Sequence, residues 1–143
     1  MLKTKLLHPE ILSVLATAGH GSRVLIADGN YPFATGSHAS ARRVYLNLAP
    51  GIVSSTDVLH TLLQVIPIEM AAGMLPESGE EPAIFDEFRS LLPKQVALES
   101  LGRAEFYEAV RDQNTALVIA TGEQRAFANL LLTIGVANPS ATG

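Results

Sequence analysis

The alternation of helix-like and strand-like segments is what most constrains the fold of this chain. Residues 9–18 carry apolar side chains at helical spacing, and residues 23–28 form a short apolar run typical of a buried strand. Three more helices are predicted over 54–66, 82–92 and 103–111, and four more strands over 44–49, 68–74, 95–101 and 116–120. Residues 127–136 are apolar too, but their periodicity does not distinguish a helix from a strand. Because helices that alternate with strands form parallel sheets, we expect an α/β fold, a single three-layer domain over residues 1–143 with a central, mostly parallel sheet flanked by helices.

The low charge content indicates that other subunits cover part of the surface. Charged residues make up 17% of the chain and hydrophobic residues 48%, whereas about a quarter charged is usual for a globular domain. Permanent subunit interfaces are more apolar than ordinary surface, so the low charge predicts a homo-oligomer. A net charge of −4 without a basic cluster argues against nucleic acid as a partner. The apolar runs are too short for a membrane span and the N-terminus does not resemble a signal peptide, so we expect a cytoplasmic protein.

The sequence offers little for a metal ion. It contains no cysteine, which excludes thiolate zinc sites and disulfides. Of its four histidines, His8, His38 and His60 have no spacing that would gather them with His20 around one ion. We expect His8 to cap the first helix, and we expect no metal site.

A histidine between two glycines stands out in the first helix–strand unit. The segment Gly19-His20-Gly21 follows the first helix, and Asp28 ends the strand after it. We therefore expect His20 in the turn that leaves the helix and Asp28 where the strand leaves the sheet. Because ligands of open α/β sheets bind outside the carboxyl ends of strands, we expect both side chains within reach of a ligand. Two plainer roles stay open: His20 as a cap of the helix, and Asp28 as a turn residue.

Short motifs in a fixed order along the chain are similar to those of one family. They are His8-Pro9-Glu10-Ile11, Gly19-His20-Gly21, Ala27-Asp28, Pro32, Phe106-Tyr107-Glu108, Thr121-Gly122-Glu123, and Asn129-Leu130-Leu131-Leu132 followed by Gly135-Val136. Their joint order and spacing cover nearly the whole chain and resemble the ribose pyranase / fucose mutarotase family. The Phe-Tyr-Glu and Thr-Gly-Glu motifs are closer to the L-fucose mutarotase branch, whereas Ala128-Asn129 is closer to the ribose branch.

The resemblance implies an isomerase that interconverts forms of a free monosaccharide without a cofactor. It also implies ring-shaped assemblies, typically decamers, whose active sites are completed by a neighbouring subunit. By the same resemblance, His20 is the catalytic acid/base and Asp28 holds sugar hydroxyls. The further positions that it places at the sugar are Glu69, Arg103, Tyr107, Phe127 and Asn129. The chemistry also needs a second proton carrier, and we expect the Tyr107 phenol or a bound water molecule in that role.

The chemistry expected of such a site is modest. Mutarotation removes a proton from the anomeric hydroxyl and delivers one to the ring oxygen, which opens the ring and lets it close on the other face. A histidine side chain has an ordinary pKa near ~6.5 and can serve in both directions at neutral pH. General acid/base assistance of roughly 10²–10⁴-fold is enough, because the reaction already proceeds in water.

One departure from the family pattern bears on the substrate. The family usually has a tyrosine where this chain has Phe127, so one hydroxyl contact is absent or is supplied by Tyr107, Tyr31 or Tyr45. The resulting hypothesis is a mutarotase for L-fucose or a related hexose, with D-ribose as the second choice. Its rivals are a sugar-binding subunit without catalysis and a structural assembly protein. At the level of single residues, packing for Tyr107, a solvated charge for Arg103, a structural network for Asn129 and a salt bridge for Glu69 also stay open.

Overall fold

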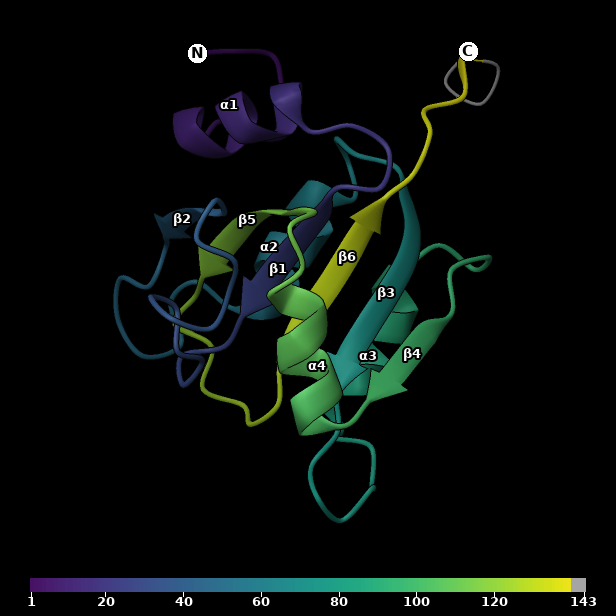
Figure 1. The fold of residues 1–143 in the computed structure, drawn as a ribbon. Helices are drawn as coiled ribbons and strands as arrows, with labels where there is room; N and C mark the ends of the chain where they lie inside the picture. Colours follow the sequence, from purple (N-terminus) through teal and green to yellow (C-terminus); the bar gives the residue numbers. More distant parts are fainter. Residues whose placement is uncertain (140–143) are drawn as a thin grey trace.

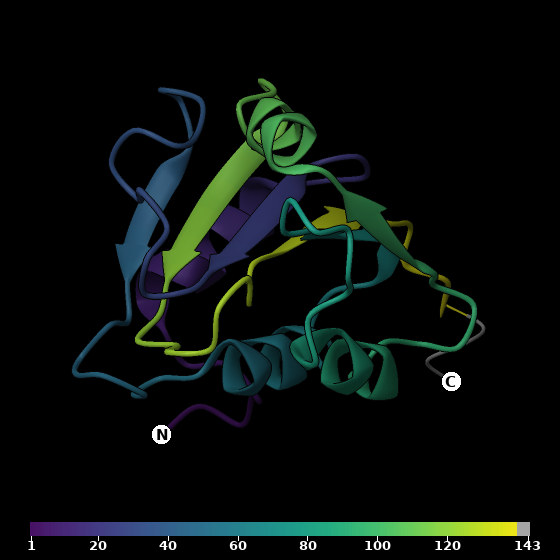
Figure 2. The ribbon, with the colours of Figure 1, turned by 90° about the horizontal axis from the view of Figure 1, so that it is seen from below.

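A six-stranded sheet lies between two layers of helices in the computed structural model, which describes residues 1–139 (Figure 1, Figure 2). The helices are α1 (Pro9–Thr17), α2 (Ser55–Leu62), α3 (Ile84–Leu91) and α4 (Arg103–Val110). The strands are β1 (Arg23–Ala27), β2 (Arg42–Tyr45), β3 (Ile68–Met74), β4 (Leu98–Leu101), β5 (Thr115–Ala120) and β6 (Leu130–Ile134). The expected three-layer α/β architecture is confirmed.

The strand order gives the sheet two functionally different edges. The order is β2-β5-β1-β6-β3-β4, and only β6 runs antiparallel to its neighbours β1 and β3. The carboxyl ends of the five parallel strands therefore lie at one edge of the sheet, together with the amino end of β6. We call this the carboxyl edge, and the opposite one the amino edge. The loops that follow β1 and β3, and the loop that joins β5 to β6, all meet at the carboxyl edge.

The core fills both faces of the sheet. On one face α1, α2 and α3 pack against the strands, with Phe85 and Phe88 of α3 fully buried. On the other face α4 packs on β3 and buries Phe106 and Val110 in a second cluster with residues of β1, β3, β5 and β6, which Tyr31 in the loop after β1 joins. Figure 2 shows the sheet between α2 and α3 on one side and α4 on the other.

The second strand differs from its predicted position. Alternation predicted a strand over 44–49, but β2 ends at Tyr45, which pairs with the last residue of β5, Ala120. Beyond this point no neighbouring strand remains to pair with. The chain instead bends back on itself through hydrogen bonds between Leu48 and Ile52, and the Leu48 side chain is exposed. The alternating pattern there reflects a surface loop.

Two other details concern the ends of the chain. His8 caps α1 as expected, because its Nδ1 accepts a hydrogen bond from the Ile11 N–H at 3.3 Å. The apolar stretch that periodicity left open contains β6, which lies between β1 and β3 in the middle of the sheet. A strand covered on both faces has no polar side to alternate with, and this explains its continuous apolar sequence.

Candidate functional site

A cavity of about 210 Å³ at the carboxyl edge gathers five of the seven side chains expected at the sugar. Asp28 follows β1, Asn129 precedes β6 and Arg103 begins α4. The five residues are Asp28, Arg103, Tyr107, Phe127 and Asn129, and Asn30, Tyr31, Met74 and Ala126 complete the lining. The volume is below the ~300–1,000 Å³ of pockets for drug-sized ligands, which suits a small molecule.

Asp28 and Asn129 form a reciprocal pair at the floor of this cavity. The Asp28 N–H donates to Asn129 Oδ1 at 2.7 Å, and Asn129 Nδ2 donates to Asp28 Oδ2 at 3.2 Å. The other carboxylate oxygen, Oδ1, accepts from the N–H of Asn30 at 3.0 Å. Both side chains are buried in the monomer, and the pair fixes their orientation. Asp28 therefore both stabilises the turn after β1 and lines the cavity. Asn129 likewise belongs to a structural hydrogen-bond network and lines the cavity.

Burial decides the ionisation of Asp28. It raises the pKa of the carboxyl above its ordinary 3.8, although hydrogen bonds from Asn30 and Asn129 act in the opposite direction. A buried carboxyl that still has free acceptor capacity and faces a cavity is suited to receive hydroxyl donors.

Tyr107 lies in an aromatic wall of the cavity. Its ring stacks on that of Tyr31 with 5.4 Å between centroids, and the Arg111 guanidinium lies 5.5 Å from the Tyr107 centroid on the same helix. The Tyr31 hydroxyl donates to the Gly36 carbonyl at 2.5 Å and so is already engaged. Within residues 1–139 the Tyr107 hydroxyl makes no hydrogen bond, which leaves it available to a ligand. Tyr45 does not line the cavity, because it packs edge-on against Phe33 on the edge strand β2.

Phe127 reaches the cavity through a strained backbone. Its φ of +57° lies in the left-handed region, which is disfavoured for a bulky aromatic residue and costs of order 1–3 kcal/mol. Such strain persists only where the surroundings enforce it, and at this position the constraint places an aromatic ring beside Asn129. Arg103 lines the same cavity from the first turn of α4 and is otherwise exposed.

The structure does not bring His20 and Glu69 to this cavity. His20 lies in the turn between α1 and β1, and Glu69 lies at the start of β3, so both are at the amino edge. His20 Nε2 is 2.9 Å from Glu69 Oε2, and both side chains are substantially exposed. His20 lies in the turn after α1, as expected, and in a single copy it is at the opposite end of β1 from Asp28. The five residues of β1 span about 16 Å at ~3.3 Å per residue, and they separate the two.

An ion pair between the buried Glu123 and the exposed Arg125 anchors the loop that carries Phe127 and Asn129. Glu123, which is 4% exposed, accepts hydrogen bonds from the Arg125 guanidinium at 2.8 and 3.2 Å and from the Ser55 N–H at 3.2 Å. Burial would raise the pKa of Glu123, but the hydrogen bonds and charge of Arg125 outweigh it and hold the pKa below 4.5. The Ser55 hydroxyl also donates to the Ala128 carbonyl at 2.9 Å. The first turn of α2 therefore holds both ends of the loop 123–128.

Sequence reasoning missed some of the lining residues. Asn30 and Met74 were not singled out, although both sit at or just beyond the carboxyl ends of predicted strands, and that rule would have found them. The anchoring role of Glu123 and Arg125 was also missed. A buried carboxylate partner cannot be recognised from the sequence alone, because the contact with Ser55 joins positions far apart in the chain.

No cluster of three or more His, Asp or Glu side chains suited to a metal ion occurs in the part of the chain that the structure describes. Over the same residues, no helix has the length and apolar character needed to cross a membrane.

Comparison with known proteins gives a consistent result. The model of the RbsD / FucU transport protein family matches residues 1–137. The chain belongs to this family. It is 35% identical over 142 residues to a D-ribose pyranase of Variovorax paradoxus, with 95% of this chain and 98% of that protein covered. It is also 33% identical over 145 residues to a fucose mutarotase of Danio rerio, with 93% and 91% covered.

Solved structures of the family share the fold. Bacillus subtilis RbsD, solved with D-ribose, superposes with a TM-score of 0.83 at 24% identity and covers 96% of this chain and 100% of that one. FucU of Bifidobacterium longum superposes with a TM-score of 0.78 at 31% identity, covering 92% and 95%.

Proposed function

We propose that this protein is a cofactor-independent mutarotase for a free monosaccharide, with L-fucose or a related hexose as its substrate class. The observation that carries the proposal is the 210 Å³ cavity in which Asp28, Tyr107 and Asn129 meet. Relatives that are similar over more than nine tenths of this chain are named as a D-ribose pyranase and fucose mutarotases. The 35% identity to the pyranase makes D-ribose the second candidate.

The cavity residues divide naturally into roles. Asp28 accepts hydrogen bonds from vicinal sugar hydroxyls, and Asn129 keeps the carboxylate oriented and offers its own amide. Arg103 donates from the rim, and Phe127 packs against the apolar face of the ring. The Tyr107 phenol, or a bound water molecule, delivers a proton to the ring oxygen as the bond between that oxygen and the anomeric carbon breaks.

His20 reaches this cavity only if it comes from another copy of the chain. In one copy it lies at the amino edge, whereas Asp28 lies at the carboxyl edge. A site that uses both must therefore combine the amino edge of one subunit with the carboxyl edge of its neighbour. We propose a ring-shaped assembly, a decamer as in the family pattern, with sites at the subunit interfaces and a cytoplasmic location. Exposed apolar side chains such as Leu48, Met70 and Val136 agree with such contacts.

Glu69 gives the histidine a defined orientation. When Nε2 carries the proton and donates to the Glu69 carboxylate, Nδ1 holds the lone pair and can take the proton of the anomeric hydroxyl. The open aldehyde then rotates about its bond to the next carbon. The ring hydroxyl then adds to the other face of the carbonyl and returns its proton to Tyr107 or the water molecule. His20 returns its proton to the new anomeric hydroxyl, so both proton carriers end in their starting states.

The proposal is tested by saturation-transfer proton NMR on the anomeric signals of L-fucose, D-ribose, D-galactose and D-glucose. We expect transfer of saturation between the α and β signals of at least one sugar, and its loss in His20→Ala with the assembly intact by light scattering. Binding of a sugar without exchange would instead identify a sugar-binding subunit. If none of the four sugars is bound or exchanged, both the mutarotase and the sugar-binding hypotheses are contradicted.

A further inference from the structure

A second, larger cavity adjoins the one that holds Asp28. It measures about 440 Å³ and is formed by residues 29–30 after β1, residues 47–50 after β2 and residues 121–124 after β5. Asn30 lines both cavities, so the two open onto a common boundary at the carboxyl edge. Among the described residues of a single copy, none of those given a role in the monosaccharide site lines this space.

Backbone hydrogen bonds hold the three segments of this cavity together. The N–H of Gly29 donates to the Glu123 carbonyl at 2.8 Å, and the N–H of Gly51 donates to the Gly122 carbonyl at 2.6 Å. A Cβ atom at Gly122 would collide with the carbonyl oxygens of Ala49 and Ile52, so the close approach there requires glycine. The cavity is therefore a pre-formed feature of the loops, and binding to it needs little ordering of the chain.

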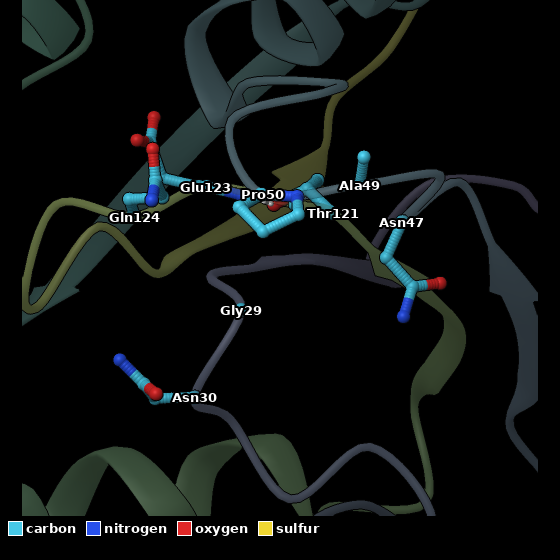
Figure 3. Close-up of a pocket in the computed structure, with 9 residues that line it drawn as sticks. Gly29, Asn30, Asn47, Ala49, Pro50, Thr121, Glu123 and Gln124 are labelled. Carbon is cyan, nitrogen blue, oxygen red and sulfur yellow. Dashed lines mark hydrogen bonds between the residues drawn. The ribbon is translucent and has the colours of Figure 1, made fainter.

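The lining is rich in unpaired amides and lacks free charge. Figure 3 shows Asn30, Asn47 and Gln124 on three separate chain segments around Gly29 and Pro50. Within residues 1–139, none of these three side-chain amides makes a hydrogen bond to another residue.

No lysine, arginine or histidine lines the cavity, and the carboxylate of its only acidic residue, Glu123, is turned into the ion pair with Arg125. Three amides offer donors and acceptors to a neutral polyhydroxylated group and give no counter-charge to a phosphate.

We propose that this amide-lined cavity binds the second ring of a neutral reducing disaccharide whose reducing ring occupies the Asp28 cavity. The inference rests on the proposed mutarotase function and extends its substrate class from free monosaccharides to sugars that carry a neutral glycosyl substituent. Asn30 lies at the junction of the two rings, and Asn47 and Gln124 hold the hydroxyls of the second ring.

The test compares each reducing disaccharide with the monosaccharide that forms its reducing ring. Lactose and melibiose are paired with D-glucose, and a galactosyl-L-fucose with L-fucose, in the same anomeric saturation-transfer experiment. For the reducing ring that the protein exchanges, we expect the disaccharide to be exchanged too and bound at least about fivefold more tightly. Saturation-transfer difference spectra of the complex should show contacts to protons of both rings.

Variants separate the second cavity from the first. Asn47→Ala and Gln124→Ala should each lower the rate on the disaccharide relative to that on the monosaccharide by about 2- to 10-fold, as expected for one lost hydrogen bond. Gln95→Ala, an exposed amide that lines neither cavity, is the matched control and should leave this ratio unchanged.

The possible failures are distinguishable. Exchange of a monosaccharide without binding of its disaccharide would overturn the second cavity and leave the mutarotase intact. Tighter binding of glucose 6-phosphate than of any disaccharide would overturn the assignment to a neutral ring. If no sugar is exchanged but a disaccharide still gives difference signals from both rings, the cavity stands and the mutarotase fails. Absence of all binding would overturn both.

Discussion

Phe127 is the residue at which the family resemblance led us to expect a missing hydroxyl at the sugar. The ring lines the Asp28 cavity from a backbone with a φ of +57°, and it brings no hydroxyl there. Because Tyr31 is engaged with Gly36 and Tyr45 lies elsewhere, Tyr107 is the only tyrosine of the three with a free hydroxyl at the cavity, among the residues described.

Restoring the hydroxyl should therefore strengthen the site. Phe127→Tyr keeps the aromatic ring and requires the same backbone conformation, and it adds one hydroxyl donor that can reach the sugar. We expect about 2- to 10-fold tighter binding or faster exchange, the value of one hydrogen bond. The measurement is the anomeric exchange rate as a function of sugar concentration. A lower rate for a normally folded variant would mean that the cavity is shaped for an apolar wall.

The pair of Asp28 and Asn129 makes the site sensitive to acid. The ionised carboxylate accepts sugar hydroxyls more strongly than the protonated carboxyl does, and burial raises the pKa of Asp28 above 3.8. Sugar binding should accordingly weaken as the pH falls, starting above the pH expected for an exposed aspartate. The hydrogen bond from Asn129 lowers this pKa, so Asn129→Ala should move the loss of binding to higher pH.

The shift in Asn129→Ala is measured by titrating sugar binding against pH in both proteins. Urea unfolding at each pH provides the control, because removal of the amide also leaves the Asp28 N–H without its partner and should cost about 1–3 kcal/mol. An unchanged pH profile in a folded variant would show that Asn129 does not act through the ionisation of Asp28.

At the level of elements, α2 and the loop before β6 work as one unit. Ser55 at the start of α2 contacts both Glu123 and the carbonyl of Ala128, and Arg125 ties the same loop to Glu87 of α3 at 2.8 Å. The strained Phe127 lies between these anchors. Contacts with α2 and α3 thus help to hold Phe127 in its place at the cavity.

Loss of the Glu123 charge should weaken this unit. The pKa of Glu123 is held below 4.5 in the folded protein, so the ion pair stabilises the fold above pH 4.5 and this contribution is lost as the pH falls through the folded value. Glu123→Gln should lower the free energy of unfolding by about 1–3 kcal/mol at pH 7. The difference from the wild type should shrink at progressively lower pH. Urea unfolding at several pH values measures it, and a difference that does not depend on pH would contradict the assignment.

Much of the element structure was predictable, and the exceptions have physical causes. The His8 cap and the apolar spacing of α1 identified the first helix, since local chemistry defines both. β2 was misplaced because its partner β5 ends at Ala120, which the sequence of β2 does not reveal. β6 could not be typed because both of its faces are buried.

The candidate site was predictable in part for similar reasons. The family resemblance named five of the nine residues that line the Asp28 cavity, and the position of Asp28 just after β1 also follows from the rule that ligands bind at the carboxyl ends of strands. In one copy His20 and Asp28 lie at opposite edges, because one precedes β1 and the other follows it. Which copy supplies which group is a property of the assembly and not of local sequence.

At the scale of the whole molecule, the two halves of the proposed site lie on opposite edges of one sheet. The amino edge carries His20 with Glu69, and the carboxyl edge carries Asp28 with its cavity. A site shared between subunits, as proposed, would join the amino edge of one copy to the carboxyl edge of the next, and such head-to-tail contacts form a closed ring when the rotation between neighbours closes. The charge content of 17% agrees with surfaces that are covered in this way.

The most direct measurement is complementation between two inactive variants. His20→Ala and Asp28→Asn are given different affinity tags, co-expressed, and purified through both tags so that every assembly contains both. Each variant alone should show no anomeric exchange, whereas mixed assemblies should recover about one quarter of the wild-type rate, because one interface in four joins an intact His20 to an intact Asp28 cavity. Mixed assemblies that stay inactive, or a His20→Ala variant that is active alone, would contradict a site shared between subunits.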